Sequence, residues 1–168
     1  MKNLFDQTFS SERLTLQSLI TEDASFIQQL TNSPGWLEYI GNRKINNEED
    51  AKNYIQKIAE MPEANYWKIV EKKNGKAVGV ITLIKRDYLN DYDIGYALLP
   101  DYEGQGFAYE GSVEILEHAI GKSSQGVIYA VTKKVNIKSI KLLEKIGLSY
   151  ARTLDLDGDI VELYEIRK

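Results

Sequence analysis

The apolar residues of this chain recur with two different periods, and each period indicates a different kind of element. Between residues 13 and 19, Leu14 and Leu16 alternate with polar residues, which is the pattern of a half-buried strand. Between residues 48 and 59, apolar residues recur every three or four positions behind an acidic start, which favours a helix. The chain therefore mixes strands and helices.

The same two periods predict the remaining elements. We expect strands over residues 66–71, 77–85, 92–99 and 127–132, helices over 21–30, 107–120 and 136–146, a short turn over 36–40, and a last strand pair joined at Asp157-Gly158. Asn74-Gly75 is a strong hairpin signal, so the strands on either side of it should be antiparallel. Thr21 can cap the helix that follows it, and Gly121 and Gly147 are expected to end theirs.

This order of elements predicts one α/β domain that spans residues 1–168. Antiparallel strands lead into a strand-helix-strand unit at the centre, which gives a mixed, mostly antiparallel sheet. We expect about seven strands, flanked by about four to five helices. A chain of 168 residues has the usual length of a single domain.

Composition excludes several functional classes. The net charge is −4 and the pI is near 5.2, whereas a protein that wraps nucleic acid needs a surplus of Lys and Arg. There is no cysteine and His118 is the single histidine, so thiolate and multi-histidine metal sites are excluded. The polar N-terminal residues and the short apolar runs argue against a signal peptide and a membrane span. We therefore expect a cytoplasmic protein that binds no metal.

Two glycines, Gly104 and Gly106, lie at the junction between the strand over 92–99 and the next helix. Glycine lets the backbone approach a ligand closely, and the free amides of a helix's first turn favour an anion. A Walker loop requires Gly-Lys-Ser/Thr, but Phe107 follows Gly106, and a dinucleotide fingerprint requires a third glycine where Tyr109 stands. The turn is therefore either another kind of phosphate site or a tight turn without a ligand.

Two segments resemble motifs of a known family. Asp93-Ile94-Gly95-Tyr96, together with residues 100–110, resembles the coenzyme A motif of the GNAT superfamily of acyl-CoA N-acyltransferases. Residues 136–148 are similar to the family's Asn-x-x-Ser helix, which ends in Glu-Lys-x-Gly-Phe. Arg13-Leu14-Thr15-Leu16 and Thr21-Glu22-Asp23-Ala24 resemble the branch that includes the ribosomal-protein N-terminal (alanine/serine) acetyltransferases.

The resemblance implies a GNAT fold whose sheet is splayed at a bulge near residues 96–99, with acetyl-CoA as co-substrate. Its pantetheine arm would lie in the opening and its pyrophosphate on the amides of residues 104–109. The implied cofactor-binding residues are Leu98, Leu99, Gly104, Gln105, Gly106, Phe107, Ala108, Tyr109, Asn136 and Ser139. Asp101 replaces the Gln or Arg that often opens the family's loop, and we expect it to point to solvent, away from the pyrophosphate.

Acetyl transfer needs a proton donor for the departing thiolate. Many members of the superfamily use a tyrosine at the position where this chain has Leu143. The ribosomal-protein branch instead has a serine at the position of Ser139, so the resemblance implies Ser139 as the donor and Asn136 as a contact to the pantetheine or the acceptor. The residues alone also permit a plainer role for Asn136, which is to cap its helix.

Two carboxylates are candidates for the base that accepts the amine proton. Asp93 lies on the strand that enters the glycine turn, although its alternation with Ile94 also fits a solvated face. Glu38 lies in the early helical region, where this family builds its acceptor site. A free amine can also react without a dedicated base.

Three functions are consistent with the sequence. The leading one is an acetyl-CoA-dependent N-acetyltransferase that modifies a primary amine, either a protein or peptide N-terminus or a small molecule, by direct attack in a ternary complex. The others are a non-catalytic acyl-CoA-binding regulatory module and a structural domain with an empty turn. We expect a monomer or homodimer, with one or two of four aromatic residues facing the acceptor pocket: Trp36, Tyr39, Trp67 and Tyr96.

Overall fold

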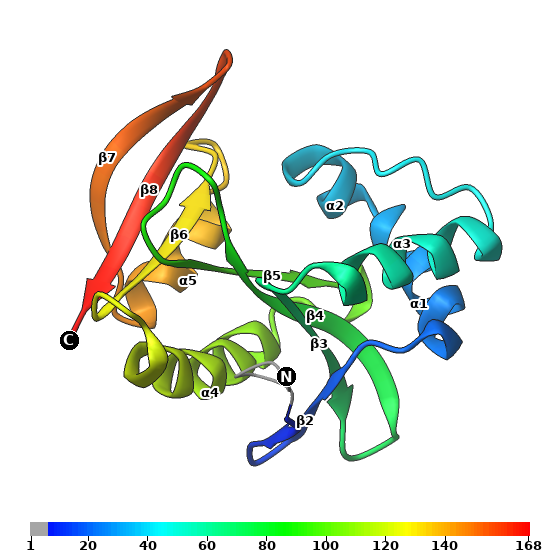
Figure 1. The fold of residues 1–168 in the computed structure, drawn as a ribbon. Helices are drawn as coiled ribbons and strands as arrows, with labels where there is room; N and C mark the ends of the chain where they lie inside the picture. The colour runs from blue at the N-terminus through cyan, green and yellow to red at the C-terminus, as the bar shows by residue number, and fades with distance from the viewer. Residues whose placement is uncertain (1–6) are drawn as a thin grey trace.

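The computed structural model describes residues 7–168, whose strands form one eight-stranded sheet in the order β1-β2-β3-β4-β5-β6-β8-β7 (Figure 1). Every neighbouring pair is antiparallel except β5 and β6, which are parallel. The predicted mixed sheet is confirmed, and the short β1 is an additional strand. The strands are β1 (Phe9–Ser10), β2 (Leu14–Ser18), β3 (Ala64–Glu71), β4 (Lys76–Lys85), β5 (Tyr92–Leu98), β6 (Val127–Thr132), β7 (Ser149–Leu156) and β8 (Asp159–Arg167).

Helices cover both faces of the sheet. The helical elements are η1 (Thr21–Asp23), α1 (Ala24–Thr31), α2 (Pro34–Tyr39), α3 (Glu48–Glu60), η2 (Pro100–Tyr102), α4 (Phe107–Lys122) and α5 (Ile137–Lys145). Apolar residues of α4 and α5 pack with Ile81 of β4, whereas those of α1, α2 and α3 pack with Val80. Because adjacent residues of a strand point to opposite faces, the two helix groups lie on opposite sides of the sheet.

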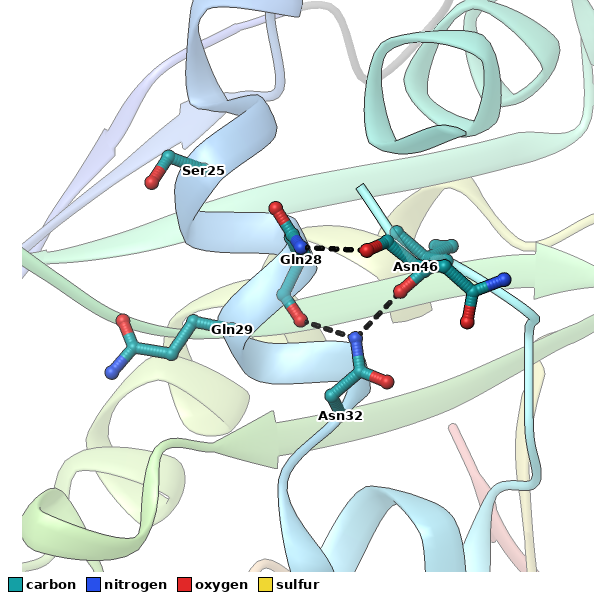
Figure 2. Close-up of a pocket in the computed structure, with 6 residues that line it drawn as sticks. Ser25, Gln28, Gln29, Asn32 and Asn46 are labelled. Carbon is teal, nitrogen blue, oxygen red and sulfur yellow. Dashed lines mark hydrogen bonds between the residues drawn. The ribbon is translucent and has the colours of Figure 1, made fainter. Parts of the chain in front are cut away.

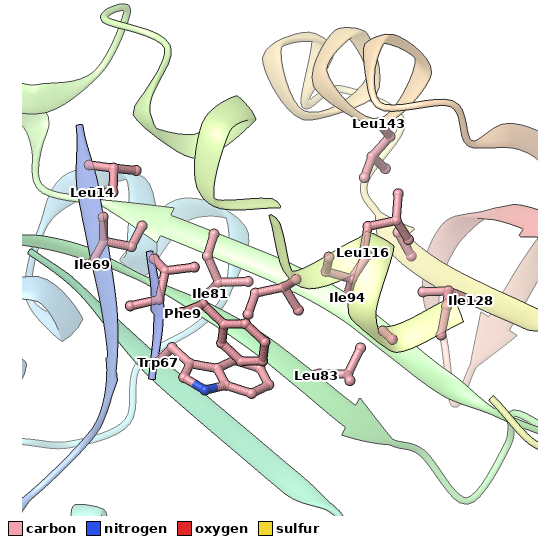
Figure 3. Close-up of a cluster of buried hydrophobic side chains, with 14 of the residues drawn as sticks. Phe9, Leu14, Trp67, Ile69, Ile81, Leu83, Ile94, Leu116, Ile128 and Leu143 are labelled. Atoms are coloured by element: carbon pink, nitrogen blue, oxygen red, sulfur yellow. The ribbon is translucent and has the colours of Figure 1, made fainter. Parts of the chain in front are cut away.

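The larger apolar cluster lies between the sheet and α4. Figure 3 shows Trp67, Ile81 and Ile94 from three strands packed toward Leu116 of α4 and Leu143 of α5. Trp67 and Ile81 are almost completely buried, so burial of apolar surface fixes the sheet against α4. Because β5 is central in the sheet and packed on both faces, its end is held firmly where it enters the glycine turn.

An opening separates β5 from β6. The two strands are connected through α4, and their parallel register contains one pair, Asp93 with Tyr129. Beyond that pair, β5 continues against β4 and β6 continues against β8. The predicted splay at this strand is therefore present.

The bulge predicted near residues 96–99 is wrong in its position. β5 keeps a regular register with β4 from Tyr92 to Leu98, and the register shift lies between β3 and β4, where Val78 is the extra residue. The amide of Leu99 donates to the carbonyl of Val78 over 2.8 Å. This bond extends the regular pairing of β5 with β4 as far as Leu99, whereas Val78 is extra relative to β3.

Two predicted helix boundaries are also wrong. Thr21 lies inside η1 and does not cap it; the carboxylate of Asp23 accepts from the amide of Ile20 instead. Gly121 lies inside α4, which continues to Lys122, because Gly121 does not adopt the left-handed conformation that ends helices. By contrast, Gly147 has a φ of 103° and directly follows Ile146, the C-cap of α5, so the predicted end of that helix is confirmed.

Among residues 7–168, no helix is both long and apolar enough to span a membrane. The same residues contain no group of three or more His, Asp or Glu side chains suited to hold a metal ion.

Candidate functional site

The glycine turn presents a row of free amides. Gly104 and Gly106 have φ values of 75° and 82°, and Gly106 is the N-cap of α4 without a side chain to cap the helix. Within the described chain, no hydrogen bond is donated by the amides from Gly104 to Tyr109. A helix N-terminus with unpaired amides attracts an anion through their partial positive charge. The predicted strand, turn and helix are confirmed, and their geometry suits a phosphate group.

The side chains of the turn leave these amides uncovered. Gln105 donates from Nε2 to the carbonyl of Asp101 over 3.0 Å, which closes the turn on itself. Asp101 is exposed, as expected. Phe107 and Ala108 are buried beneath the turn, whereas Tyr109 is partly exposed and its ring lies 4.4 Å from Nζ of Lys145.

The edge of β5 that faces the opening has unpaired main-chain groups. In an antiparallel pair, successive residues alternate between bonding their neighbour and pointing away from it. Because Leu99 bonds Val78 of β4, the amides and carbonyls of Tyr96 and Leu98 point away from β4, toward the opening. Leu98 can therefore bond an extended ligand that contains amide groups, whereas the amide of Leu99 is already used and its side chain is buried.

Ser139 lies across this opening from β5. Asn136 is the N-cap of α5, and its Oδ1 accepts from the amide of Ser139 over 3.2 Å, so the plainer capping role is present. Ser139 is buried, with 9% of its surface exposed, and its side chain hydrogen-bonds the hydroxyl of Tyr96. Burial raises the pKa of Tyr96, although the bond from Ser139 opposes that rise. Tyr96 therefore keeps its proton at neutral pH beside the serine.

Asp93 occupies the vertex of the opening and is not on a solvated face. Only 5% of its surface is exposed, and its Oδ2 accepts from Nε of Arg86 over 2.9 Å. The amide of Val131 in β6 donates to the same carboxylate. The side chain of Asp93 therefore replaces the main-chain acceptor in β5 at the point where β6 leaves β5. Burial raises the pKa of Asp93 to about 6, and the nearby Arg86 opposes that rise.

Glu38 and Tyr39 lie in α2, near the mouth of the opening. Glu38 is exposed and hydrogen-bonds the hydroxyl of Tyr39, whose pKa is raised by burial and by Glu38. Lys138 of α5 and Glu103 of the glycine turn form an ion pair of 3.4 Å and also act on Tyr39. Three separate segments thus meet at the mouth, but no hydrogen bond or ion pair of the described residues joins Glu38 to Asp93 or Ser139.

The amino-acid sequence matches the model of one protein family. The model of the acetyltransferase (GNAT) domain matches residues 13–149. The chain belongs to the GNAT acetyltransferase family. It is therefore an N-acetyltransferase, and the predicted family is confirmed.

The chain is also similar to a curated relative and to solved structures. "Uncharacterized N-acetyltransferase p20" of Bacillus licheniformis is 28% identical over 145 residues, which are 84% of this chain and 82% of the relative. A ribosomal L7/L12 alpha-N-protein acetyltransferase in complex with coenzyme A has a TM-score of 0.81 at 16% identity, covering 96% of this chain and 98% of that one. A spermidine N-acetyltransferase chimera from Vibrio cholerae and hSSAT has a TM-score of 0.74 at 19% identity, covering 93% of this chain and 96% of that one. The last two share the fold with this acetyltransferase.

The aromatic residues of the acetyltransferase divide into two groups. Trp36 and Trp67 are buried in the two apolar clusters, with 5% and 1% of their surfaces exposed. Tyr39 and Tyr96 are partly exposed at the mouth and wall of the opening. The sequence predicted that one or two of these aromatic residues face the acceptor pocket, and Tyr39 and Tyr96 are the candidates for that role.

Two hollows of the acetyltransferase lie beside α1. Figure 2 shows the first, of about 620 Å³, where Asn32 donates to the carbonyls of Gln28 and Ile45 and Gln28 donates to that of Asn46. These bonds tie the segment before α3 to α1. The second, of about 710 Å³, is bounded by acidic side chains, so it is unfavourable for a phosphate. Those acidic residues are Glu22, Asp23 and Asp101, against one basic residue of the lining, Lys76.

Two contacts of the site were not predicted. The sequence predicts Tyr96 only as a pocket wall, not as the partner of Ser139, and gives no role to Arg86. Arg86 lies just after β4, which pairs antiparallel with the strand of Asp93. A cation seven residues before a strand carboxylate, across a hairpin, is a weak signal that would have indicated this ion pair.

Proposed function

We propose that this acetyltransferase moves the acetyl group of acetyl-CoA to a primary amine by direct attack in a ternary complex. The observation that supports this most strongly is the row of free amides from Gly104 to Tyr109 beside the opening between β5 and β6. The amides suit the pyrophosphate of coenzyme A, because they supply hydrogen-bond donors and the positive end of a helix dipole. The main-chain groups of Leu98 suit the amides of the pantetheine arm.

Ser139 is the proposed proton donor. The free amine nitrogen bonds to the thioester carbonyl carbon, the carbon–sulfur bond breaks, and the thiolate receives the hydroxyl proton of Ser139. The acylated nitrogen releases one proton to solvent. Tyr96 then returns a proton to the serine through their hydrogen bond, and solvent reprotonates the tyrosine. Leu143 has no proton to donate and is buried in the apolar cluster, so it offers no competing donor. Asn136 fixes Ser139 by accepting its amide.

The amine proton does not require a dedicated base in this proposal. Asp93 is engaged by Arg86, and Glu38 is exposed and bonded to Tyr39. The acceptor therefore reacts from its free-amine fraction, and Asp93 and Glu38 are the residues to test for a larger role.

The acceptor is a primary amine, either a protein or peptide N-terminus or a small molecule. One structural neighbour is named for a ribosomal-protein N-terminus and another for spermidine, so acceptors of both kinds belong in the first screen. Mass spectrometry of acetylated products from free-N-terminal peptides, polyamines and amino sugars would identify the class. A cysteine-free chain suits the reducing cytoplasm, where we place the enzyme.

The deciding experiment measures binding and turnover separately. Calorimetry should detect acetyl-CoA binding to the wild-type protein, and thiol release should detect transfer to an amine. Ser139→Ala should lower kcat by about 10²-fold or more with little change in acetyl-CoA affinity, since general acid catalysis contributes about 10²–10⁴-fold. Tyr96→Phe, which keeps the ring, should lower kcat less. Unchanged turnover in Ser139→Ala would remove it from the mechanism, and binding without transfer to any amine would favour the regulatory module.

A further inference from the structure

Arg13, just before β2, contacts both the glycine turn and the first turn of α4 with its guanidinium group. Its Nε bonds Oε2 of Glu110 over 2.7 Å, and its Nη1 donates to the carbonyl of Gln105 over 2.9 Å. Its guanidinium also lies 4.7 Å from the ring centre of Phe107. One planar group therefore connects the first turn of α4 to the residue between the two glycines.

The partner of Arg13 is itself held in place. Oε1 of Glu110 accepts from the amide of Arg13 and from the hydroxyl of Ser11, each over 2.7 Å. These bonds lower the pKa of Glu110, against the effect of burial, so it stays charged at neutral pH. Arg13 and Glu110 thus form a neutral, fixed pair, whose effect on a nearby anion comes mainly from geometry.

The contact to Gln105 controls which atoms of the turn face a ligand. A carbonyl oxygen has a partial negative charge and repels an anion, whereas an amide attracts it. Because Gly106 lacks a side chain, the peptide between Gln105 and Gly106 can rotate more freely than most. The bond from Arg13 fixes that carbonyl on the β2 side of the turn. The amides that follow Gln105 stay free, as described above.

We propose that Arg13 is a positioning residue for the diphosphate of the acyl donor: it holds the Gln105 carbonyl away so that the amides of residues 106–109 face the anion. This inference rests on the proposed function, because it assumes that acetyl-CoA is the donor. The side chain of Arg13 is 44% exposed, and exposed ion pairs contribute little to stability. Its removal should therefore affect the turn more than the fold.

The experiment compares two acetyl donors. Acetyl-CoA contains the diphosphate, whereas acetyl-pantetheine has the same thioester and arm but no phosphate. Arg13→Gln should raise KM for acetyl-CoA by about tenfold or more with kcat nearly unchanged, since misplacement by about 1 Å can cost about 10²-fold. Its kcat/KM for acetyl-pantetheine should stay within about twofold of wild type.

Two further variants make the comparison specific. Arg167→Gln removes the same charge from an exposed arginine that pairs with Glu165 on its own strand, and it should not change either donor's KM. Arg13→Lys restores the charge but not the fork that reaches both Glu110 and Gln105. It should therefore restore less than half of the lost acetyl-CoA affinity on a logarithmic scale.

Each result has a defined meaning. Equal losses for both donors in Arg13→Gln, or full recovery in Arg13→Lys, would overturn the positioning role, as would an unchanged KM for acetyl-CoA. If the wild-type protein itself shows no affinity for acetyl-CoA, the proposed function fails and this inference fails with it. Wild-type binding combined with an unaffected Arg13→Gln contradicts only the inference.

Discussion

Gly79 in β4 supports the end of β5, and replacing it with alanine should disturb both stability and donor binding. A Cβ atom at Gly79 would lie 2.3 Å from the carbonyl oxygen of Ala97 and 2.6 Å from Cδ2 of Leu98. The nearest of these atoms is main chain, so it cannot rotate away. Restoring an ordinary contact of 3.4 Å requires β4 and β5 to separate by roughly 1 Å at this point.

The size of the effect follows from that displacement. Added carbon atoms in a packed site typically cost about 1–3 kcal/mol, and a main-chain clash belongs at the upper end. We expect Gly79→Ala to lower the free energy of unfolding by about 3 kcal/mol. Because the displaced residues include Leu98 at the proposed pantetheine edge, acetyl-CoA should bind about tenfold or more weakly.

Gly121→Ala is the matched control. It makes the same chemical change inside α4, where a Cβ atom would meet nothing within 4 Å. Alanine favours a helix over glycine by about 0.5–1 kcal/mol, so this variant should be slightly more stable than wild type with unchanged acetyl-CoA affinity. Denaturant unfolding and calorimetry measure both quantities. Wild-type stability and affinity in Gly79→Ala would refute the packing argument.

Two aspartates separated by one residue should give opposite pH signatures. Burial would raise the pKa of Asp91, but hydrogen bonds from Ser123, Ser124 and the amides of Tyr92 and Gln125 outweigh it and lower the pKa. The ionised Asp91 therefore stabilises the folded protein above pH 3.8, and this contribution is lost as the pH falls. Asp91→Asn should remove that acid sensitivity in unfolding experiments. The pKa of Asp93 is raised from 3.8 to about 6 by burial. Its contribution to the free energy of unfolding, on the order of 3 kcal/mol, is present below pH 3.8 and is lost as the pH rises to about 6. Asp93→Asn should remove this dependence of stability on pH. The pH profile of kcat/KM should keep its shape in Asp93→Asn; loss of a limb near pH 6 would identify Asp93 as the base.

Elements with local signals were predicted well. The β3–β4 hairpin follows from Asn74-Gly75, and the end of α5 follows from Gly147, because a left-handed glycine is decided by its own neighbours. The bulge at Val78 and the short β1 depend on pairing between distant strands. A period-two pattern indicates a strand but does not indicate which residue is extra in it.

The site divides in the same way. The glycine turn and the Asn136 cap lie within short continuous segments and were predicted from them. The contacts of Ser139 with Tyr96 and of Arg13 with Glu110 join residues far apart in sequence, the second pair 97 positions apart. Sequence pattern gives each residue's type but not its partner. The interpretation that placed Asp93 on a solvated face was wrong for a related reason. Alternation cannot indicate that a helix covers the second face of a strand.

The alternation of β5 bears directly on how the two substrates meet. Tyr96, which bonds Ser139, lies on the face packed against α4 and α5, with Ile94. Ala97 and Leu99 lie on the face packed against α1 and α3. Asp93 is in phase with them, and its partner Arg86 acts on Tyr66, which bonds Tyr54 of α3. Tyr96, the partner of the proposed proton donor Ser139, and the candidate base Asp93 are therefore on opposite faces of one strand. Such a separation suits an acetyl donor and an amine acceptor that enter the opening from opposite sides and react directly. Neither Tyr96 nor Asp93 is placed to pass an acetyl group to the other.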